Sequence, residues 1–179
     1  MKNLRLTLVA SPIITGVVIG LCSLTQWGAK HFFGIDLPIQ NQLDIVRSRI
    51  GFNREFLLLA AQILIVAPVF EEILFRLVLF KLPVSLLRLK KAFGIAIVAM
   101  LSAAIFSAAH YPDWRAIAET HSMVWLPLSN AFLALFAFGL AQCWLYRKTT
   151  WLWSPMLAHF TFNLINLVLL VTLPAEYFS

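Results

Sequence analysis

Charged residues are scarce in this sequence. Asp, Glu, Lys and Arg make up 12% of its 179 residues, against 61% hydrophobic residues. Soluble domains are nearer one quarter charged and one half apolar, so this composition excludes a soluble globular domain. Basic runs long enough to follow a phosphate backbone are also missing, so the net charge of +6 does not indicate a nucleic-acid partner. With a mean hydropathy of +0.85, we expect one integral membrane domain over residues 1–179.

Cysteine is nearly absent too, and the two cysteines, Cys22 and Cys143, both lie in apolar stretches. They provide no disulfide framework, and we interpret both as small buried hydrophobic residues. The apolar stretch that follows Lys2 and Arg5 has no small-x-small cleavage site after it, which indicates a retained first span. The sequence contains no internal repeats, which argues against a typical secondary transporter.

Long hydrophobic runs, in contrast, are abundant. A helix needs about 20 residues to cross a hydrocarbon core of about 30 Å, and five apolar segments reach that length. The five predicted spans are Leu6–Trp27, Phe56–Phe80, Ala92–His110, Met123–Tyr146 and Trp151–Leu173. Residues 30–55 are polar and of mixed charge, and residues 83–91 interleave leucine with cations as interfacial segments do. The predicted fold is an all-α, polytopic transmembrane helix bundle of about five spans plus interfacial segments.

The distribution of lysine and arginine between the loops orients this bundle. The cations on the side of the N-terminus are Lys2, Arg5, Lys81, Arg88, Lys90, Lys91, Arg147 and Lys148. Those on the other side are Lys30, Arg47, Arg49, Arg54 and Arg115. Because the first group is larger, the positive-inside rule favours a cytoplasmic N-terminus and an outside C-terminus.

Three charged side chains interrupt the second predicted span, which reads VAPVFEEILFRLVLF. Each of Glu71, Glu72 and Arg76 would cost at least about 2.5–3.5 kcal/mol near mid-membrane if it faced lipid, so all three must face the bundle interior. Glu72 and Arg76 are four residues apart and can pair on one helix face. Glu71 is turned about 100° away and keeps a carboxylate free for chemistry. Pro68 can loosen this helix and leave a carbonyl unpaired near the site.

Polar side chains also recur at helical spacing in the third and fifth predicted spans. Phe106 and His110 are four residues apart, in a segment whose serines and alanines permit close helix contact. His159, Asn163 and Asn166 follow an i, i+4, i+7 pattern on one face of the fifth span. Two imidazoles, a free carboxylate and a carboxamide from three helices can converge on one cavity, activate water and stabilise an oxyanion.

Each of these features also has a purely structural interpretation. A lone membrane histidine or asparagine is more often a helix–helix hydrogen bond than a catalyst, and the Glu72–Arg76 pair can be structural. Phe106 is interpreted as a packing residue. Buried carboxylates and histidines also relay protons in ion carriers. Their joint occurrence on three apolar spans is what favours a catalytic site.

Three motifs in these spans resemble, in order, those of the CPBP family of membrane proteases, which includes the type II CAAX prenyl endopeptidases and many bacterial abortive-infection-like proteins. The motif residues are Glu71, Glu72 and Arg76, then Phe106 and His110, then His159 and Asn163. The resemblance covers a core of about residues 56–173. Leu77 stands where the family usually has glycine, and only Ser102 is kept of a serine-rich lead into the second motif.

The resemblance implies hydrolysis of a peptide bond inside a membrane cavity. By position in the motifs, Glu71 would be the general base that activates water, and Glu72 and Arg76 would hold Glu71 in place. His110 would hold the water or a metal. These assignments make all four residues part of the predicted catalytic site.

The third motif, His159 and Asn163, would polarise the scissile carbonyl and stabilise the tetrahedral oxyanion. Members of the family are called metalloproteases, which implies Zn²⁺ or another divalent metal, with Glu71, His110 and His159 as its expected ligands. However, HExxH is absent, and asparagine is a poor zinc ligand. A metal site and a metal-free, glutamate-driven site both stay open.

The implied partners are the lipid bilayer and a membrane-associated peptide or protein substrate. A short chain with a compact first span is more typical of a bacterial protein, so we expect the inner (cytoplasmic) membrane of a bacterium. A non-catalytic membrane immunity or scaffold protein that retains the protease fold is the alternative function. The substrate and the oligomeric state are left open by the sequence.

The predicted span boundaries place the motif residues at different depths in the membrane. Glu71 lies about nine residues from the cationic end of its span and His159 about eight from the start of its own, whereas His110 lies about 18 from Ala92. At about 1.5 Å per residue the depths differ by about 13 Å. The motif residues can meet only if the third span is tilted or begins later than predicted.

Overall fold

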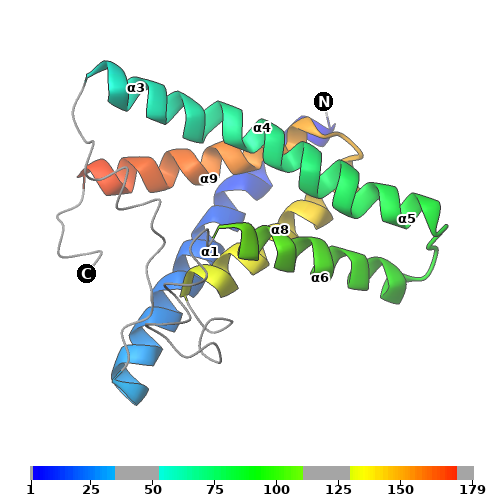
Figure 1. Ribbon diagram of the computed structural model, residues 1–179, viewed down its shortest axis with the longest axis horizontal. Helices are drawn as coiled ribbons and strands as arrows, with labels where there is room; N and C mark the ends of the chain where they lie inside the picture. The colour runs from blue at the N-terminus through cyan, green and yellow to red at the C-terminus, as the bar shows by residue number, and fades with distance from the viewer. Residues whose placement is uncertain (1, 35–52, 111–129, 173–179) are drawn as a thin grey trace.

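The computed structural model describes residues 2–34, 53–110 and 130–172, and the regular secondary structure in these ranges is all helical. The elements are α1 (Lys2–Phe33), α3 (Arg54–Ala61), η1 (Gln62–Val66), α4 (Ala67–Glu72), η2 (Ile73–Lys81), α5 (Leu82–Leu86), α6 (Ala92–Ala109), α8 (Asn130–Thr149) and α9 (Trp153–Thr172). The elements from α3 to α5 follow one another without a break and form one long helical rod (Figure 1). We call residues 54–86 the rod. The predicted all-α helix bundle is confirmed.

Three helices in the described ranges, α1, α6 and α9, are long and apolar enough to cross a membrane. They match the first, third and fifth predicted spans. The second predicted span lies within the rod, where the two π-helical segments η1 and η2 interrupt the α-helix. The fourth lies on α8, and its first residues, 123–129, are outside the described residues. The same is true of the C-terminal end of the fifth span, of most of the polar segment at 30–55 and of three cations used for orientation, Arg47, Arg49 and Arg115.

The length of the rod accounts for the disagreement in depth between Glu71 and His110. The second span was predicted to end at Phe80, but the helical structure continues through α5 to Leu86. Glu71 therefore lies 15 positions from the end of the rod (86 − 71), and His110 lies 18 positions from Ala92 (110 − 92). A difference of three positions is about 4.5 Å of helix. The third span begins at Ala92 as predicted, and the end of the second was wrong. His159 lies six positions from the start of α9 (159 − 153), so the rod does not account for its depth.

The π-helical segment η1 creates the unpaired carbonyl that was expected near Pro68. Its register is set by the N–H of Ala67, which donates to the carbonyl of Gln62 five residues earlier. In that register the carbonyl of Ile63 would accept from residue 68, but proline has no N–H. Asn163 on α9 supplies the donor, because its Nδ2 donates to Ile63 O at 2.8 Å. This bond attaches α9 to the rod.

The apolar core forms where α6, α8, η2 and α1 meet around Phe106. Its buried members are Val18, Phe75, Phe106, Ala134, Leu135 and Phe138. Helices α6 and α8 approach closely enough that a Cβ added to Gly139 would lie 2.9 Å from the Cβ of Ala103. Small residues on the third span therefore do permit close helix contact, as predicted.

Helix α1 packs on α8 and α9. Near its N-terminus, Thr7 Oγ1 donates to Ser154 Oγ at 2.9 Å, and Asn3 Nδ2 donates to the carbonyl of Thr149 at 3.0 Å. Its C-terminal end extends away from the other helices (Figure 1). The start of α1 is thus held beside the connection between α8 and α9.

Candidate active site

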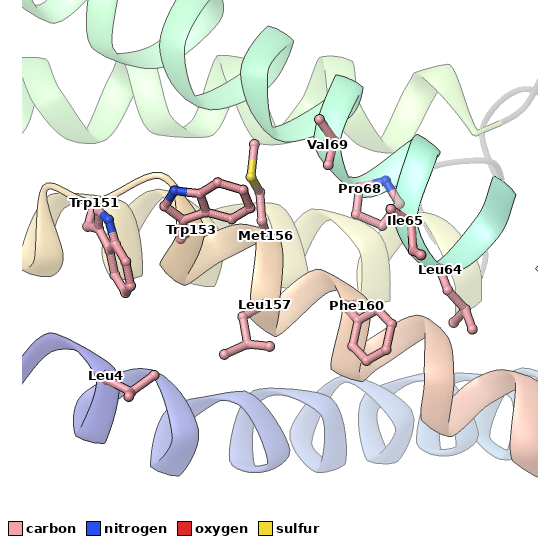
Figure 2. A pocket seen from close by; sticks show the side chains of 10 residues that line it. All are labelled: Leu4, Leu64, Ile65, Pro68, Val69, Trp151, Trp153, Met156, Leu157 and Phe160. Atoms are coloured by element: carbon pink, nitrogen blue, oxygen red, sulfur yellow. The ribbon is translucent and has the colours of Figure 1, made fainter. Parts of the chain in front are cut away.

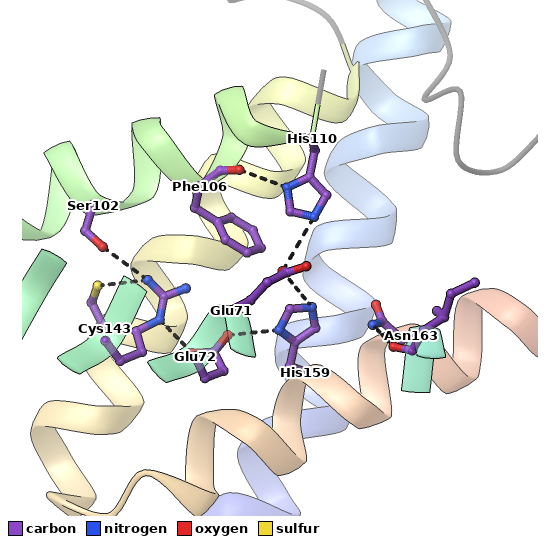
Figure 3. A network of polar contacts seen from close by, with 10 residues as sticks. Glu71, Glu72, Ser102, Phe106, His110, Cys143, His159 and Asn163 are labelled. Carbon is purple, nitrogen blue, oxygen red and sulfur yellow. Dashed lines mark hydrogen bonds and ion pairs between the residues drawn. The ribbon is translucent and has the colours of Figure 1, made fainter. Parts of the chain in front are cut away.

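Five of the six predicted catalytic side chains meet where the rod lies against α6 and α9 (Figure 3). The five are Glu71, Glu72, Arg76, His110 and His159. The rod supplies the first three, the C-terminal end of α6 supplies His110, and the second turn of α9 supplies His159. The sequence argument that these groups must face a shared interior is consistent with this geometry.

Glu72 is fully buried and contacts both Arg76 and His159. Its Oε2 accepts from Arg76 Nε at 2.8 Å, and its Oε1 lies 2.9 Å from His159 Nδ1. Both Glu72 and Arg76 have zero exposure, so the charges compensate each other out of contact with solvent. Because a carboxylate only accepts, the Nδ1 of His159 is the donor in this bond. The other ring nitrogen, Nε2, is then left free to act in the site.

Arg76 is held by two further residues that the sequence did not assign to the site. Its Nη1 lies 3.4 Å from Ser102 Oγ and 3.5 Å from Cys143 Sγ. Its guanidinium carbon lies 5.4 Å from the centroid of the Phe106 ring, a cation–π contact. Ser102 could have been identified, since it is four residues before Phe106 on the same face of α6. Nothing in the sequence distinguished Cys143 from an ordinary buried thiol.

Glu71 faces the two histidines, His110 and His159, and its side chain is 27% exposed. Its Oε2 lies 3.7 Å from His110 Nε2 and 3.8 Å from His159 Nε2, beyond hydrogen-bond distance. This oxygen is buried and has no hydrogen-bond partner among the residues that the structure describes. The Nδ1 of His110 donates to the carbonyl of Phe106 at 2.8 Å, which turns Nε2 of the same ring towards Glu71. The two carboxylates of the acidic pair therefore have different environments, as predicted.

Three hydrogen-bond acceptors surround the space in front of Glu71. With Nδ1 donating in each neutral imidazole, the two Nε2 atoms carry lone pairs, as does the carboxylate oxygen. Acceptors that face one another need a donor between them. A water molecule fits this requirement, because its hydrogens can donate to two of the three groups while its oxygen stays free. The arrangement can therefore bind a water molecule and remove a proton from it.

The predicted metal ligands are near one another but do not form a recognisable metal site. In the part of the chain that the structure describes, no group of three or more His, Cys, Asp or Glu side chains has an arrangement that could hold a metal ion. A divalent metal on Glu71, His110 and His159 stays a prediction, and no chemical step below is derived through one.

The two residues of the third motif have different places in the structure, since His159 lies in the site and Asn163 contacts the rod. Asn163 lies one turn beyond His159, and its Nδ2 is bonded to the rod at Ile63 rather than to Glu71 (Figure 3). The second hydrogen of that nitrogen is not used in the bond. Asn166, the next residue of the predicted polar stripe, donates to the carbonyl of Phe162 on its own helix at 2.8 Å. A role for Asn163 at the oxyanion stays a prediction.

Comparison with known proteins adds one finding. A family model described as type II CAAX prenyl endopeptidase Rce1-like matches residues 53–165. Neither the curated proteins nor the solved structures that were searched contain a match. The matched segment spans the rod, α6, α8 and most of α9, and it includes all six predicted catalytic residues. With three helices able to cross a membrane, the chain is an integral membrane protein of a protease family. The resemblance inferred from the motifs is confirmed, and the chain belongs to the Rce1-like family of type II CAAX prenyl endopeptidases.

Proposed function

We propose that this protein is an intramembrane endopeptidase that uses water activated by Glu71 to cut a membrane-associated peptide or protein. The observation that carries the proposal is the buried Oε2 of Glu71, which has no hydrogen-bond partner in the described part of the chain and lies within 4 Å of imidazoles from two other helices. A carboxylate with a purely structural role would be expected to make short hydrogen bonds, as Glu72 does. A water molecule held for reaction would supply the donor that the neighbouring side chains do not.

In the proposed reaction, Glu71 accepts a proton from a water molecule bound between its carboxylate and the two Nε2 atoms. The water oxygen forms a bond to the scissile carbonyl carbon, and the carbonyl oxygen takes up the negative charge. The tetrahedral intermediate then collapses, and Glu71 delivers its proton to the leaving nitrogen as the C–N bond breaks. One water molecule is consumed, and the products are a new carboxyl terminus and a new amine.

The remaining residues orient and stabilise these groups. Glu72 and Arg76 are positioning residues, because they contact His159 and each other rather than the reacting atoms. The Glu72 carboxylate accepts from Nδ1 of His159 and so fixes this ring, with Nε2 facing the water molecule. We assign to His110 the role of holding the water molecule, and to the free N–H of Asn163 a contact to the oxyanion.

Two further assignments belong to this proposal. The N-terminus is cytoplasmic, and the membrane is the bacterial inner membrane.

If a divalent metal is present, Glu71, His110 and His159 are its ligands. Elemental analysis of the purified protein, compared with that of His159→Ala, tests for bound metal independently of any activity.

The proposal is tested by reconstituting the purified protein in lipid vesicles with fluorogenic peptides that carry an apolar anchor. We expect cleavage by the natural protein, and a loss of at least about 100-fold in kcat/KM for His110→Ala and His159→Ala. His31→Ala is the matched control, since His31 is exposed at the end of α1 and stacks on Trp27. Melting temperatures show that each variant is folded. Full cleavage by both active-site variants would refute the assignment, and a biological phenotype that survives them would favour the immunity or scaffold alternative.

A further inference from the structure

A second concave site lies between the start of α1, the middle of the rod and the start of α9 (Figure 2). Its volume is about 490 Å³, and all of its lining side chains are hydrophobic or aromatic. The predicted catalytic residues are not among them. We call it the groove. It is open to the surroundings of the bundle, since Ile65 and Trp153 in its wall are 58% and 60% exposed.

The groove has two chemically different ends. Trp151 and Trp153 lie at one end, at the connection between α8 and α9, and Leu64 and Phe160 lie at the other (Figure 2). Seven positions separate Trp153, the first residue of α9, from Phe160, which is about 10 Å of helix. Tryptophan is enriched at the boundary between headgroups and hydrocarbon, whereas purely apolar walls suit the hydrocarbon itself. The groove therefore has the polarity expected of a site that extends from the membrane surface towards the hydrocarbon.

Exposed cations flank the lining residues of the tryptophan end in the sequence. They come from the first two turns of α1, on either side of Leu4, and from the last turn of α8, shortly before Trp151, and they are Lys2, Arg5, Arg147 and Lys148. The hydrogen bond from Asn3 Nδ2 to Thr149 O holds these two segments together at 3.0 Å. The sequences of α1, α8 and α9 contain no Asp or Glu, so no acidic group on these helices neutralises the cations.

We propose that the groove binds one acyl chain of an anionic phospholipid, whose phosphate is held by these cations. Basic clusters between transmembrane helices are known to hold anionic headgroups. A single chain is favoured, because the groove offers only about two turns of apolar helix along its length. This lipid site is independent of the proposed peptidase activity, because none of its residues takes part in the chemistry.

The test uses tryptophan fluorescence in vesicles of phosphatidylcholine that contain a minor fraction of a chain-brominated lipid, which quenches on contact. Trp151 and Trp153 are kept, and the other four tryptophans are replaced by phenylalanine. Brominated phosphatidylglycerol is expected to quench at least about fivefold more effectively than brominated phosphatidylcholine at equal mole fraction. Replacing the four cations by glutamine is expected to abolish that preference.

The matched control is Lys90→Gln with Lys91→Gln, which removes two cations from the connection between α5 and α6 (Figure 1). The preference for phosphatidylglycerol is expected to survive this change. Equal quenching by both lipids would overturn the proposal and leave only general contact with the bilayer. So would a control that loses the preference for phosphatidylglycerol as fully as the variant without the four cations. If the tryptophan-depleted protein does not fold, native mass spectrometry of the natural chain gives the same answer. Retention of phosphatidylglycerol that is lost with the four cations supports the site, and retention of neither lipid contradicts it.

Discussion

Removal of Arg76 gives a quantitative test of the buried network. In Arg76→Met the Glu72 carboxylate keeps zero exposure and loses its 2.8 Å bond to Nε. Breaking a buried ion pair by removing one partner costs about 3–5 kcal/mol, since the remaining charge is uncompensated. His159 Nδ1 still donates to Glu72 Oε1 at 2.9 Å, so we expect the lower end of that range, about 3 kcal/mol. Unfolding in mixed micelles with increasing SDS, followed by tryptophan fluorescence, measures the loss.

A double-mutant cycle separates this charge effect from simple loss of packing. Glu72→Leu with Arg76→Met removes both charges, and the double variant is expected to be more stable than the sum of the single losses by about 2 kcal/mol or more. Its peptidase activity should not return, because His159 has lost the partner of its Nδ1. Arg88→Met is the control at an exposed cation, with an expected change within about 0.5 kcal/mol. An Arg76→Met protein as stable as the natural one, or a strictly additive cycle, would refute the reasoning.

Two further changes test the helix contacts that position the site. Gly139→Ala would place a Cβ 2.9 Å from Ala103 Cβ and should destabilise the bundle by about 1–3 kcal/mol, whereas Gly16→Ala, with open space around it, should not lower the melting temperature. Asn163→Ala should cost about 1–3 kcal/mol in the natural chain, and clearly less in a Pro68→Ala background, where residue 68 regains an N–H for the orphaned carbonyl. Thermal unfolding compares the two glycine variants. Unfolding in SDS compares Asn163→Ala, Pro68→Ala and the double variant, and additive losses of unfolding free energy would contradict the register deduced for η1.

The parts of the site that follow from helical periodicity and charge could be predicted from the sequence. Glu72 and Arg76 pair because they are four residues apart, and His110 and His159 reach Glu71 because polar groups on apolar spans must face inward. These are local rules combined with the cost of burial. They require no knowledge of how the helices cross.

Features that depend on local changes of helical register or on neighbouring helices were not predictable. The bond from Asn163 to Ile63 depends on a π-helical register that apolar sequence does not specify. Cys143 contacts Arg76 only because α8 passes beside η2. The end of the rod was misplaced, because the second span was predicted to end at Phe80, before the charged Lys81. The helix continues through Pro83, where proline occupies a first-turn position of α5.

The central claim is that Glu71 removes a proton from the attacking water. It is tested most directly by the kcat/KM of Glu71→Gln on a membrane-delivered peptide, measured at equal folded fraction. We predict a loss of at least about 100-fold, with Glu55→Gln, an exposed position on the same rod, retaining the natural value. Undiminished cleavage by the Glu71→Gln protein would contradict the mechanism.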